Sequence, residues 1–245
     1  MQASGSSAEL EVSNQMASTV LWCSKTVISR TYYAPCITRS SPKQFDSSSH
    51  SSCAIVSTSK ISVMASAILV IGSTGNQGGA VINALLAAPE SLDMPILAVT
   101  RNTETAGAKA LHSKSPSRIK LIKGDLNDCD GIFKAAKVPV KSVFFVPIPA
   151  IGPRMKIVIE EIQGKALIDA AVRNAVEHFV FTSVARYGDD SESTETDVPH
   201  FITKARIEKH LQEKAGKSMT WTILRPVTFM DNVNTSFAGK VFCTV

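Results

Sequence analysis

Hydrophobic and polar positions alternate in blocks along the chain from Met64 onward. Short continuous apolar runs, such as AILVIG at 67–72 and HFVFTSV at 178–184, are typical of strands that are covered on both faces. Between these runs, apolar residues recur every three or four positions, which indicates helices. The predicted strands are 67–72, 95–102, 118–125, 141–149, 178–184 and 219–226. The predicted helices are 77–88, 106–111, 129–136, 155–175 and 202–215.

Six strands separated by helices predict an α/β fold with a doubly wound parallel sheet, because each crossover helix lies on a face of the sheet. The expected strand order is 3-2-1-4-5-6, the Rossmann arrangement, in which ligands bind beyond the carboxyl ends of the strands. No apolar run approaches the ~18 residues needed to cross a bilayer, so we expect no membrane association. The net charge of +5 includes no lysine–arginine block, which argues against direct nucleic-acid binding.

The first 63 residues differ from the rest of the chain. They contain 17 serines and no lasting periodicity, so we predict that segment 1–63 is disordered and contributes nothing to the fold. The stretch from Met16 to Gln44 has no acidic residue and resembles a transit peptide, although Glu9 and Glu11 precede it. The alternatives are an upstream extension with translation beginning at Met64, a transit peptide, or a functional tail. Localisation is accordingly expected to be cytoplasmic or nuclear, or organellar if the transit peptide is genuine.

Three glycines mark the junction of the first predicted strand and the first helix. Gly72, Gly75 and Gly78 form G-x-x-G-x-x-G, where a side chain would block a tight turn or the approach of the backbone to a pyrophosphate. The helix that follows offers N–H groups and a partial positive charge to phosphates. The residues predicted to bind a dinucleotide here are Gly72, Ser73, Thr74, Gly75, Asn76, Gln77 and Gly78.

The end of the second predicted strand distinguishes between nucleotides. An NAD site places a carboxylate there, but this chain has Arg101 and Asn102. A guanidinium matches a 2′-phosphate in charge and geometry, so we predict that NADP(H) is preferred over NAD(H). After the third strand, Asp125 and the adjacent Leu126 are placed to face the adenine, although Asp125 could equally cap the next helix. Cys129 and Cys243 are too few and too far apart for a metal or disulfide framework, so no metal site is predicted.

Several motifs in order resemble those of the NmrA-like family of atypical short-chain dehydrogenases. They are GSTGNQGG, AVTRN, IKLIKGDLND, IQGKALIDAA, HFVFTSV, HFITKARIEKHL and TILRPVTFMDN, over 64–234. The resemblance implies a Rossmann domain that binds NADP(H), in a family that includes redox-sensing regulators and is similar to isoflavone-reductase-type enzymes, which reduce small aromatic substrates. It also implies that Lys204 lies near the nicotinamide ribose and that a loop closes over the nicotinamide, formed by Phe229, Met230, Asp231 and Asn232. Some members have a lysine where this chain has Ile162.

The resemblance leaves catalysis open. Short-chain dehydrogenases use Tyr-x-x-x-Lys, and here His200 stands at the position of the tyrosine, four residues before Lys204. The candidate catalytic residues are therefore Lys204 and, more weakly, His200. Ser183 is a further weak candidate, because its hydroxyl at the end of the fifth predicted strand could polarise a carbonyl, although it could equally be an ordinary strand-end hydroxyl. We expect a redox-sensing or regulatory NADP(H) binder with a protein partner. The alternative is an NADPH-dependent reductase of a small carbonyl, quinone or phenylpropanoid-like substrate. Family members continue beyond the loop at 229–232, so domain 64–245 is expected to be incomplete at its C-terminus, with one wall of the substrate cleft missing.

Overall fold

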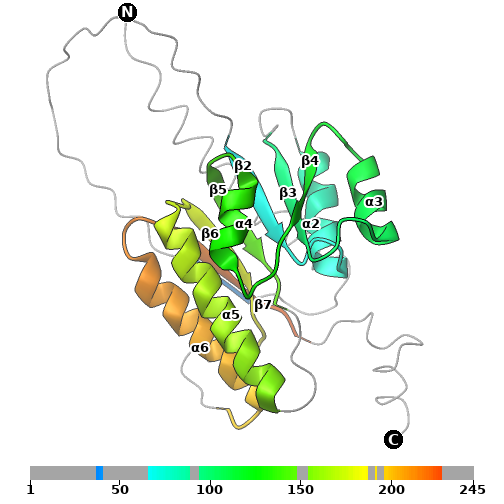
Figure 1. The fold of residues 1–245 in the computed structure, drawn as a ribbon. Helices are drawn as coiled ribbons and strands as arrows, with labels where there is room; N and C mark the ends of the chain where they lie inside the picture. Colours follow the sequence, from blue (N-terminus) through cyan, green and yellow to red (C-terminus); the bar gives the residue numbers. More distant parts are fainter. Residues whose placement is uncertain are drawn as a thin grey trace, which may run out of the picture.

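The computed structural model describes residues 37–40, 66–88, 94–147, 154–186, 191 and 196–227. In these ranges, seven strands form one sheet in the order β1-β7-β6-β5-β2-β3-β4 (Figure 1). The strands are β1 (Ile37–Ser40), β2 (Ala67–Ile71), β3 (Ile96–Thr100), β4 (Ile119–Lys123), β5 (Val140–Phe145), β6 (His178–Thr182) and β7 (Thr220–Arg225). The helices are α2 (Asn76–Leu86), α3 (Ala106–Ser113), α4 (Cys129–Ala136), α5 (Arg154–Arg173) and α6 (Pro199–Ala215).

The six strands from β2 to β7 confirm the predicted doubly wound topology. Every pair among them is parallel, and their order β4-β3-β2-β5-β6-β7 is the expected 3-2-1-4-5-6. The central strands β2 and β6 are buried along their whole length, as their continuous apolar sequences predict. The order changes direction between β2 and β5, so the carboxyl ends of these strands flank the crevice in which such folds bind ligands.

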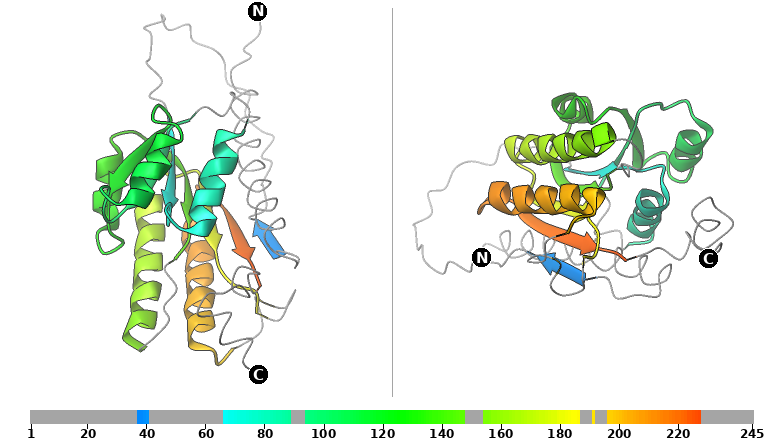
Figure 2. Two further views of the ribbon diagram at one scale, coloured as in Figure 1. Left: turned by 90° about the vertical axis from the view of Figure 1, so that its right-hand side faces the viewer. Right: turned by 90° about the horizontal axis from the view of Figure 1, so that it is seen from below.

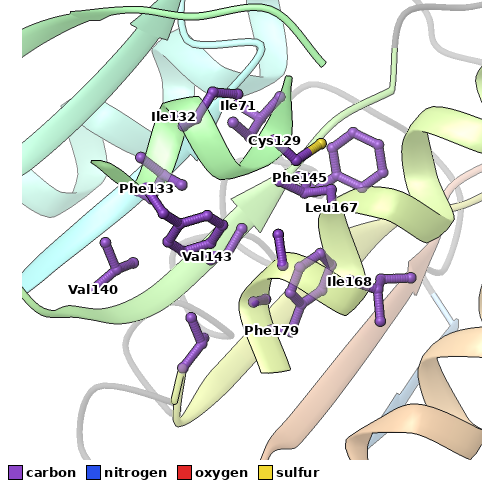
Figure 3. Close-up of a cluster of buried hydrophobic side chains, with 14 of the residues drawn as sticks. Ile71, Cys129, Ile132, Phe133, Val140, Val143, Phe145, Leu167, Ile168 and Phe179 are labelled. Atoms are coloured by element: carbon purple, nitrogen blue, oxygen red, sulfur yellow. The ribbon is translucent and has the colours of Figure 1, made fainter. Parts of the chain in front are cut away.

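Helices cover both faces of this sheet. On one face α2 and α3 pack through residues such as Ile82 and Leu111 against alternate residues of the strands. On the other face α4, α5 and α6 cover a larger apolar cluster, part of which is shown in Figure 3. Phe145 lies inside this cluster and stacks on Phe181, with 5.5 Å between ring centroids. Figure 2 shows α5 and α6 lying side by side and reaching past the carboxyl ends of the strands.

The α5–α6 pair depends on one small residue. A Cβ placed on Gly164 of α5 would lie 2.7 Å from Cδ1 of Ile207 on α6, so glycine permits the close approach of the two helices. Beyond the contact, Val158, Ile159 and Ile162 of α5 expose 53%, 41% and 60% of their surface. Ile162, where the resemblance implies a lysine in some family members, is therefore on the surface. No helix in the described ranges is both long and apolar enough to span a membrane.

One helix starts earlier than its sequence pattern predicts. The predicted start of α6 was residue 202, but the helix begins at Pro199, which occupies its first turn. Proline fits there because the first amide groups of a helix have no intrahelical partner and the ring sets a helical φ. As a result His200 lies on the first turn of α6, one turn before Lys204.

The structure departs from the prediction of disorder for 1–63 at four residues. Ile37–Ser40 form strand β1, which pairs antiparallel with β7 and extends the sheet by one edge strand. The short β-prone run lies between Pro35 and Pro42, so its sequence alone gives only a weak strand signal. The pairing needs the edge of β7, which is supplied from almost 200 positions later in the chain. The rest of 1–63 lies outside the described residues, and its disorder stays a prediction.

Candidate functional site

The glycine loop between β2 and α2 has the geometry that its sequence predicts. Gly72 has a φ of +78°, a backbone conformation that residues with a side chain rarely adopt. The Gly75 N–H donates to the carbonyl oxygen of Gly72 at 3.0 Å. A Cβ on Gly78 would lie 2.2 Å from the Gly72 oxygen, a distance that no packing tolerates. Gly78 therefore lets the first turn of α2 rest directly on the backbone of the loop, as in a dinucleotide-binding turn.

The N-terminus of α2 faces this loop and has no side-chain cap. Gly75 stands at the N-cap, and the first intrahelical bond runs from the Gly79 N–H to the Gly75 oxygen at 2.8 Å. The preceding amides of the helix are consequently left for a ligand or water. Thr74 and Asn76 are exposed beside them, while Oε1 of Gln77 is buried without a hydrogen-bond partner among the described residues. We name the glycine loop and the uncapped start of α2 the glycine cradle. The glycine cradle and the unpaired Oε1 of Gln77 both suit a polar ligand at this turn.

The side chain of Ser73 anchors the glycine loop. Its side chain is completely buried, and Oγ donates to the carbonyl of Val99 at 2.8 Å. This hydrogen bond fastens the glycine loop to the carboxyl end of β3. The hydroxyl of Ser73 therefore positions the loop, in keeping with the rule that buried polar groups have a hydrogen-bond partner. The predicted contact of Ser73 with a dinucleotide stays a prediction.

The carboxyl end of β3 separates the roles of Arg101 and Asn102. Arg101 is exposed and, within the described ranges, has no hydrogen-bond or ion-pair partner. Asn102 instead builds the turn into α3, since its Oδ1 accepts from the Glu104 N–H at 2.9 Å. Of the two predicted residues, Arg101 is thus available to a ligand, whereas the side chain of Asn102 holds the turn.

After β4, two aspartates shape the start of α4. Oδ1 of Asp125 accepts from the Asn127 N–H at 2.8 Å, while Asp128 is the N-cap and accepts from the Gly131 N–H at 2.9 Å. The sequence alternative in which Asp125 caps the helix is wrong, because the cap is Asp128. Asp125 remains exposed at the carboxyl edge of the sheet, whereas Leu126 packs partly against the core.

Ser183 lies in a buried charge cluster that the sequence did not reveal. Its hydroxyl donates to Oε1 of Glu208, and the same carboxylate binds two guanidiniums. Arg186 donates to it at 3.0 and 3.1 Å, and Arg225 donates at 2.6 Å through Nη2. Glu208, Arg186 and Arg225 are each only 2% exposed. We name these four residues the Glu208 cluster.

The Glu208 cluster fixes the charge of its carboxylate. Burial alone would raise the pKa of Glu208, but hydrogen bonds from Arg186, Arg225 and Ser183 outweigh burial and bring it below its usual value. The cluster joins the ends of β6 and β7 to α6. The Ser183 hydroxyl is therefore bonded within the cluster, and its role in polarising a carbonyl stays a prediction. The only indication of this arrangement in the sequence is that Glu208, a charged residue next to Ile207, stands at a position of α6 that faces the core.

Lys204 forms an ion pair that the sequence also missed. Its Nζ donates to Oε1 of Glu160 at 2.8 Å, across the α5–α6 contact. The lysine side chain is 13% exposed and the glutamate side chain 2% exposed. Burial and then the Lys204 charge lower the pKa of His200, against an opposing effect of Glu160. At neutral pH His200 is accordingly a neutral imidazole.

Cys129 is a buried thiol on α4, with Ile71, Ile132, Phe145 and Leu167 around it (Figure 3). Burial, then the charges of Asp130 and Asp128, raise its pKa to about 11. We therefore expect Cys129 to react with a disulfide reagent at pH 8 about a hundredfold more slowly in the native state than in urea, because only the thiolate reacts. A variant with the other four cysteines replaced by serine isolates this signal, and equal rates in both states would contradict the prediction.

The predicted site residues therefore divide between two places. The glycine loop, Arg101 and Asp125 all lie at the carboxyl edge of the sheet, at the ends of β2, β3 and β4. His200 and Lys204 lie in the first two turns of α6. Figure 2 shows that α6 reaches past that edge of the sheet. The predicted loop Phe229 to Asn232 lies outside the described residues. Among the described residues no group of three or more side chains forms a metal site.

Comparison with known proteins gives several relatives of partial length. An NmrA-like family domain-containing oxidoreductase, ptmS of Penicillium ochrochloron, is 27% identical over 67% of this chain and 48% of its own length. The chain thus spans about half the length of this curated relative. Triphenylmethane reductase from a Citrobacter species, solved with NADP(H), is 26% identical, with a TM-score of 0.46 over 61% of this chain and 46% of that one. NADPH-dependent quinone oxidoreductase QOR2 of Escherichia coli is 21% identical, with a TM-score of 0.48 over 63% of this chain and 46% of that one.

A family model gives the broadest match. The model described as "NmrA-like family" covers residues 64–244, which is the entire span from the glycine loop to the last strand and most of the segment beyond it. This range contains the six parallel strands and each motif on which the resemblance rested. The chain belongs to the NmrA-like family.

Proposed function

We propose that this protein is an NADP(H)-binding regulator, whose binding of a protein partner follows its occupancy by the dinucleotide. The carrying observation is the glycine cradle, in which Gly72 has a left-handed φ and Gly78 has no room for a Cβ. The buried, unpaired oxygen of Gln77 supports a polar ligand at the same turn. A pyrophosphate on the uncapped N-terminus of α2 would gain amide hydrogen bonds and the favourable end of the helix dipole.

The choice of a regulator over an enzyme rests on the candidate catalytic residues. Ser183 is bonded to Glu208, and Lys204 is paired with Glu160. His200 replaces the tyrosine of dehydrogenases and is a neutral imidazole. Each group that could transfer a proton is therefore either engaged elsewhere in the fold or a poor substitute for the phenol.

A second candidate function is an NADPH-dependent reductase of a small carbonyl, quinone or phenylpropanoid-like substrate. The relative from Penicillium ochrochloron, which is called an oxidoreductase, favours this reading. In that case Lys204 would hold the nicotinamide ribose or donate a proton, and NADPH would supply the hydride.

Turnover measurements separate the two candidates. A regulator binds one NADPH per chain. In the presence of a panel of quinones and enones, NADPH is then oxidised no faster with the protein than in buffer alone. A reductase oxidises NADPH with at least one of them, and Lys204→Met then removes the activity while leaving the affinity for NADP⁺ within a few fold. Failure to bind either NADPH or NADH would reject both candidates.

Arg101 carries the proposed preference for NADP(H). We expect NADPH to bind at least about tenfold more tightly than NADH, or roughly 1.4 kcal/mol. Arg101→Ala should remove most of that difference, because the exposed guanidinium is available to a 2′-phosphate. Calorimetry with both nucleotides measures the effect, and Lys114→Ala, at the far end of α3, serves as the matched loss of one positive charge. Equal affinities in the parent protein would refute the preference.

A further inference from the structure

The outer edge of β7 can be read from the hydrogen bonds on its inner side. The Thr220 N–H donates to the Glu177 oxygen, and the Leu224 oxygen accepts from the Ser183 N–H, both at 2.8 Å. The backbone groups of successive strand residues point to opposite sides, so the even-numbered residues of β7 face β6. The residues whose N–H and C=O groups face away from β6 are Trp221, Ile223 and Arg225.

Strand β1 covers this outer edge. Its register places Ile37 opposite Arg225 and Arg39 opposite Ile223. These are the two positions at which the backbone groups of both strands face each other, so Ile37 and Arg39 make the ladder hydrogen bonds. The backbone groups of Thr38 and Ser40 point away from β7. Figure 2 (left) shows β1 beside β7 at the margin of the sheet.

The strand β7 has few of the features that usually protect an edge, and its one charged residue, Arg225, is buried and paired with Glu208. Its sequence TWTILR contains no proline and no lysine, and five of its six residues are buried. Edge strands normally carry charges, prolines or bulges, because a regular open edge is a template for another strand. Here β7 has the composition of an interior strand, and β1 provides the cover.

The cover is connected to the domain only at a distance in sequence. It has four residues, and residues 41–66 separate it from β2. In the sequence Pro35 and Pro42 flank it, and proline has no amide donor for a ladder. A short strand at the edge of a sheet is the part that opens most readily.

We propose that β1 is a detachable cover, and that a second copy of this chain pairs with β7 when β1 is displaced. An antiparallel β7–β7 pair about a two-fold axis would place Ile223 of one copy opposite Ile223 of the other, with N–H and C=O groups matched. The direction is the same as that of the β1–β7 pair. The side chains of Ile223 and Arg225 can stay in their own buried positions, because the new contact uses main-chain groups.

Two proline variants of the full chain test the proposal. Arg39→Pro removes an amide that donates to β7, whereas Ser40→Pro, the matched control, removes one that points away. Hydrogen exchange of the Ile223 and Arg225 amides in dilute protein should become at least about tenfold faster with Arg39→Pro only. Light scattering over a roughly hundredfold range of concentration should show that the parent and Ser40→Pro are monomers and that Arg39→Pro becomes a dimer. A synthetic peptide of residues 34–43 should return it to the monomer.

A second variant does not depend on weakening the fold. Ser40 and Thr222 form a non-hydrogen-bonded pair, the closer type in an antiparallel ladder. Ser40→Cys with Thr222→Cys, in a Cys36→Ser background, should form a disulfide and remain monomeric at every concentration. If this disulfide does not form, the proposal that β1 covers β7 is wrong. If the β7 amides of Arg39→Pro exchange faster but the variant stays monomeric, a second copy is not the partner of β7. Equal dimerisation of both proline variants would contradict the proposal in the same way.

Discussion

Replacing Glu208 with glutamine should lower the free energy of unfolding by about 3–5 kcal/mol, the largest effect that we expect from one substitution. The glutamate is 2% exposed and is the counter-ion of both Arg186 and Arg225. Glutamine keeps the shape but leaves two buried guanidiniums without a negative charge. Urea unfolding measures the loss. The matched control is Asp130→Asn, which breaks an exposed ion pair with Arg173 and should change stability by less than about 1 kcal/mol.

The pH dependence of stability gives an independent check on Glu208. Because its pKa is lower in the folded state than in the unfolded chain, its stabilising effect is complete above the unfolded value of about 4.3. The effect is lost as the pH falls below that value and passes through the lower, folded pKa. The difference in stability between the parent and Glu208→Gln should therefore be constant at neutral pH and shrink below about pH 4.3. A difference under 1 kcal/mol at pH 7 would show that the cluster does not depend on this charge.

Gly78→Ala should remove dinucleotide binding and destabilise the domain by about 3 kcal/mol, at the upper end for overpacking. The added Cβ would lie 2.2 Å from the Gly72 oxygen, and both the loop and the start of α2 would have to move apart. Moving them disturbs the amides that would bind the pyrophosphate, so we expect affinity for NADPH to fall at least about a hundredfold.

The adjacent glycine supplies the control for this substitution. A Cβ on Gly79 would lie 3.8 Å from the Ser73 oxygen, an ordinary contact, so Gly79→Ala should retain both stability and binding. Thermal unfolding and calorimetry with NADPH measure the two effects for both variants. Normal affinity in Gly78→Ala would show that the dinucleotide does not use this loop, and equal losses in both variants would show that the effect is not one of close packing.

The sequence by itself determined the positions of the six parallel strands and of the glycine loop, and the general rules for doubly wound sheets then gave the strand order. Both depend on local information, since a buried parallel strand is a continuous apolar run and a Rossmann turn needs glycine at fixed spacing. Gly72, Gly78 and Arg101 lie where the pattern predicts, at the carboxyl ends of β2 and β3. The same local reading located the start of α6 three residues too late, because a proline in the first turn fits a helix as well as a loop.

Only the tertiary structure decided how the polar side chains of the candidate site are used. Ser183 and Glu208 are 25 positions apart, Lys204 and Glu160 are 44 apart, and Ser73 and Val99 are 26 apart. The pattern of one segment cannot indicate such partners, because a buried polar group takes whichever partner the packing of other elements brings to it. The pairing of β1 with β7 has the same origin. A four-residue run becomes a strand there because an open edge lies beside it, and the sequence around Ile37–Ser40 contains no information about that edge.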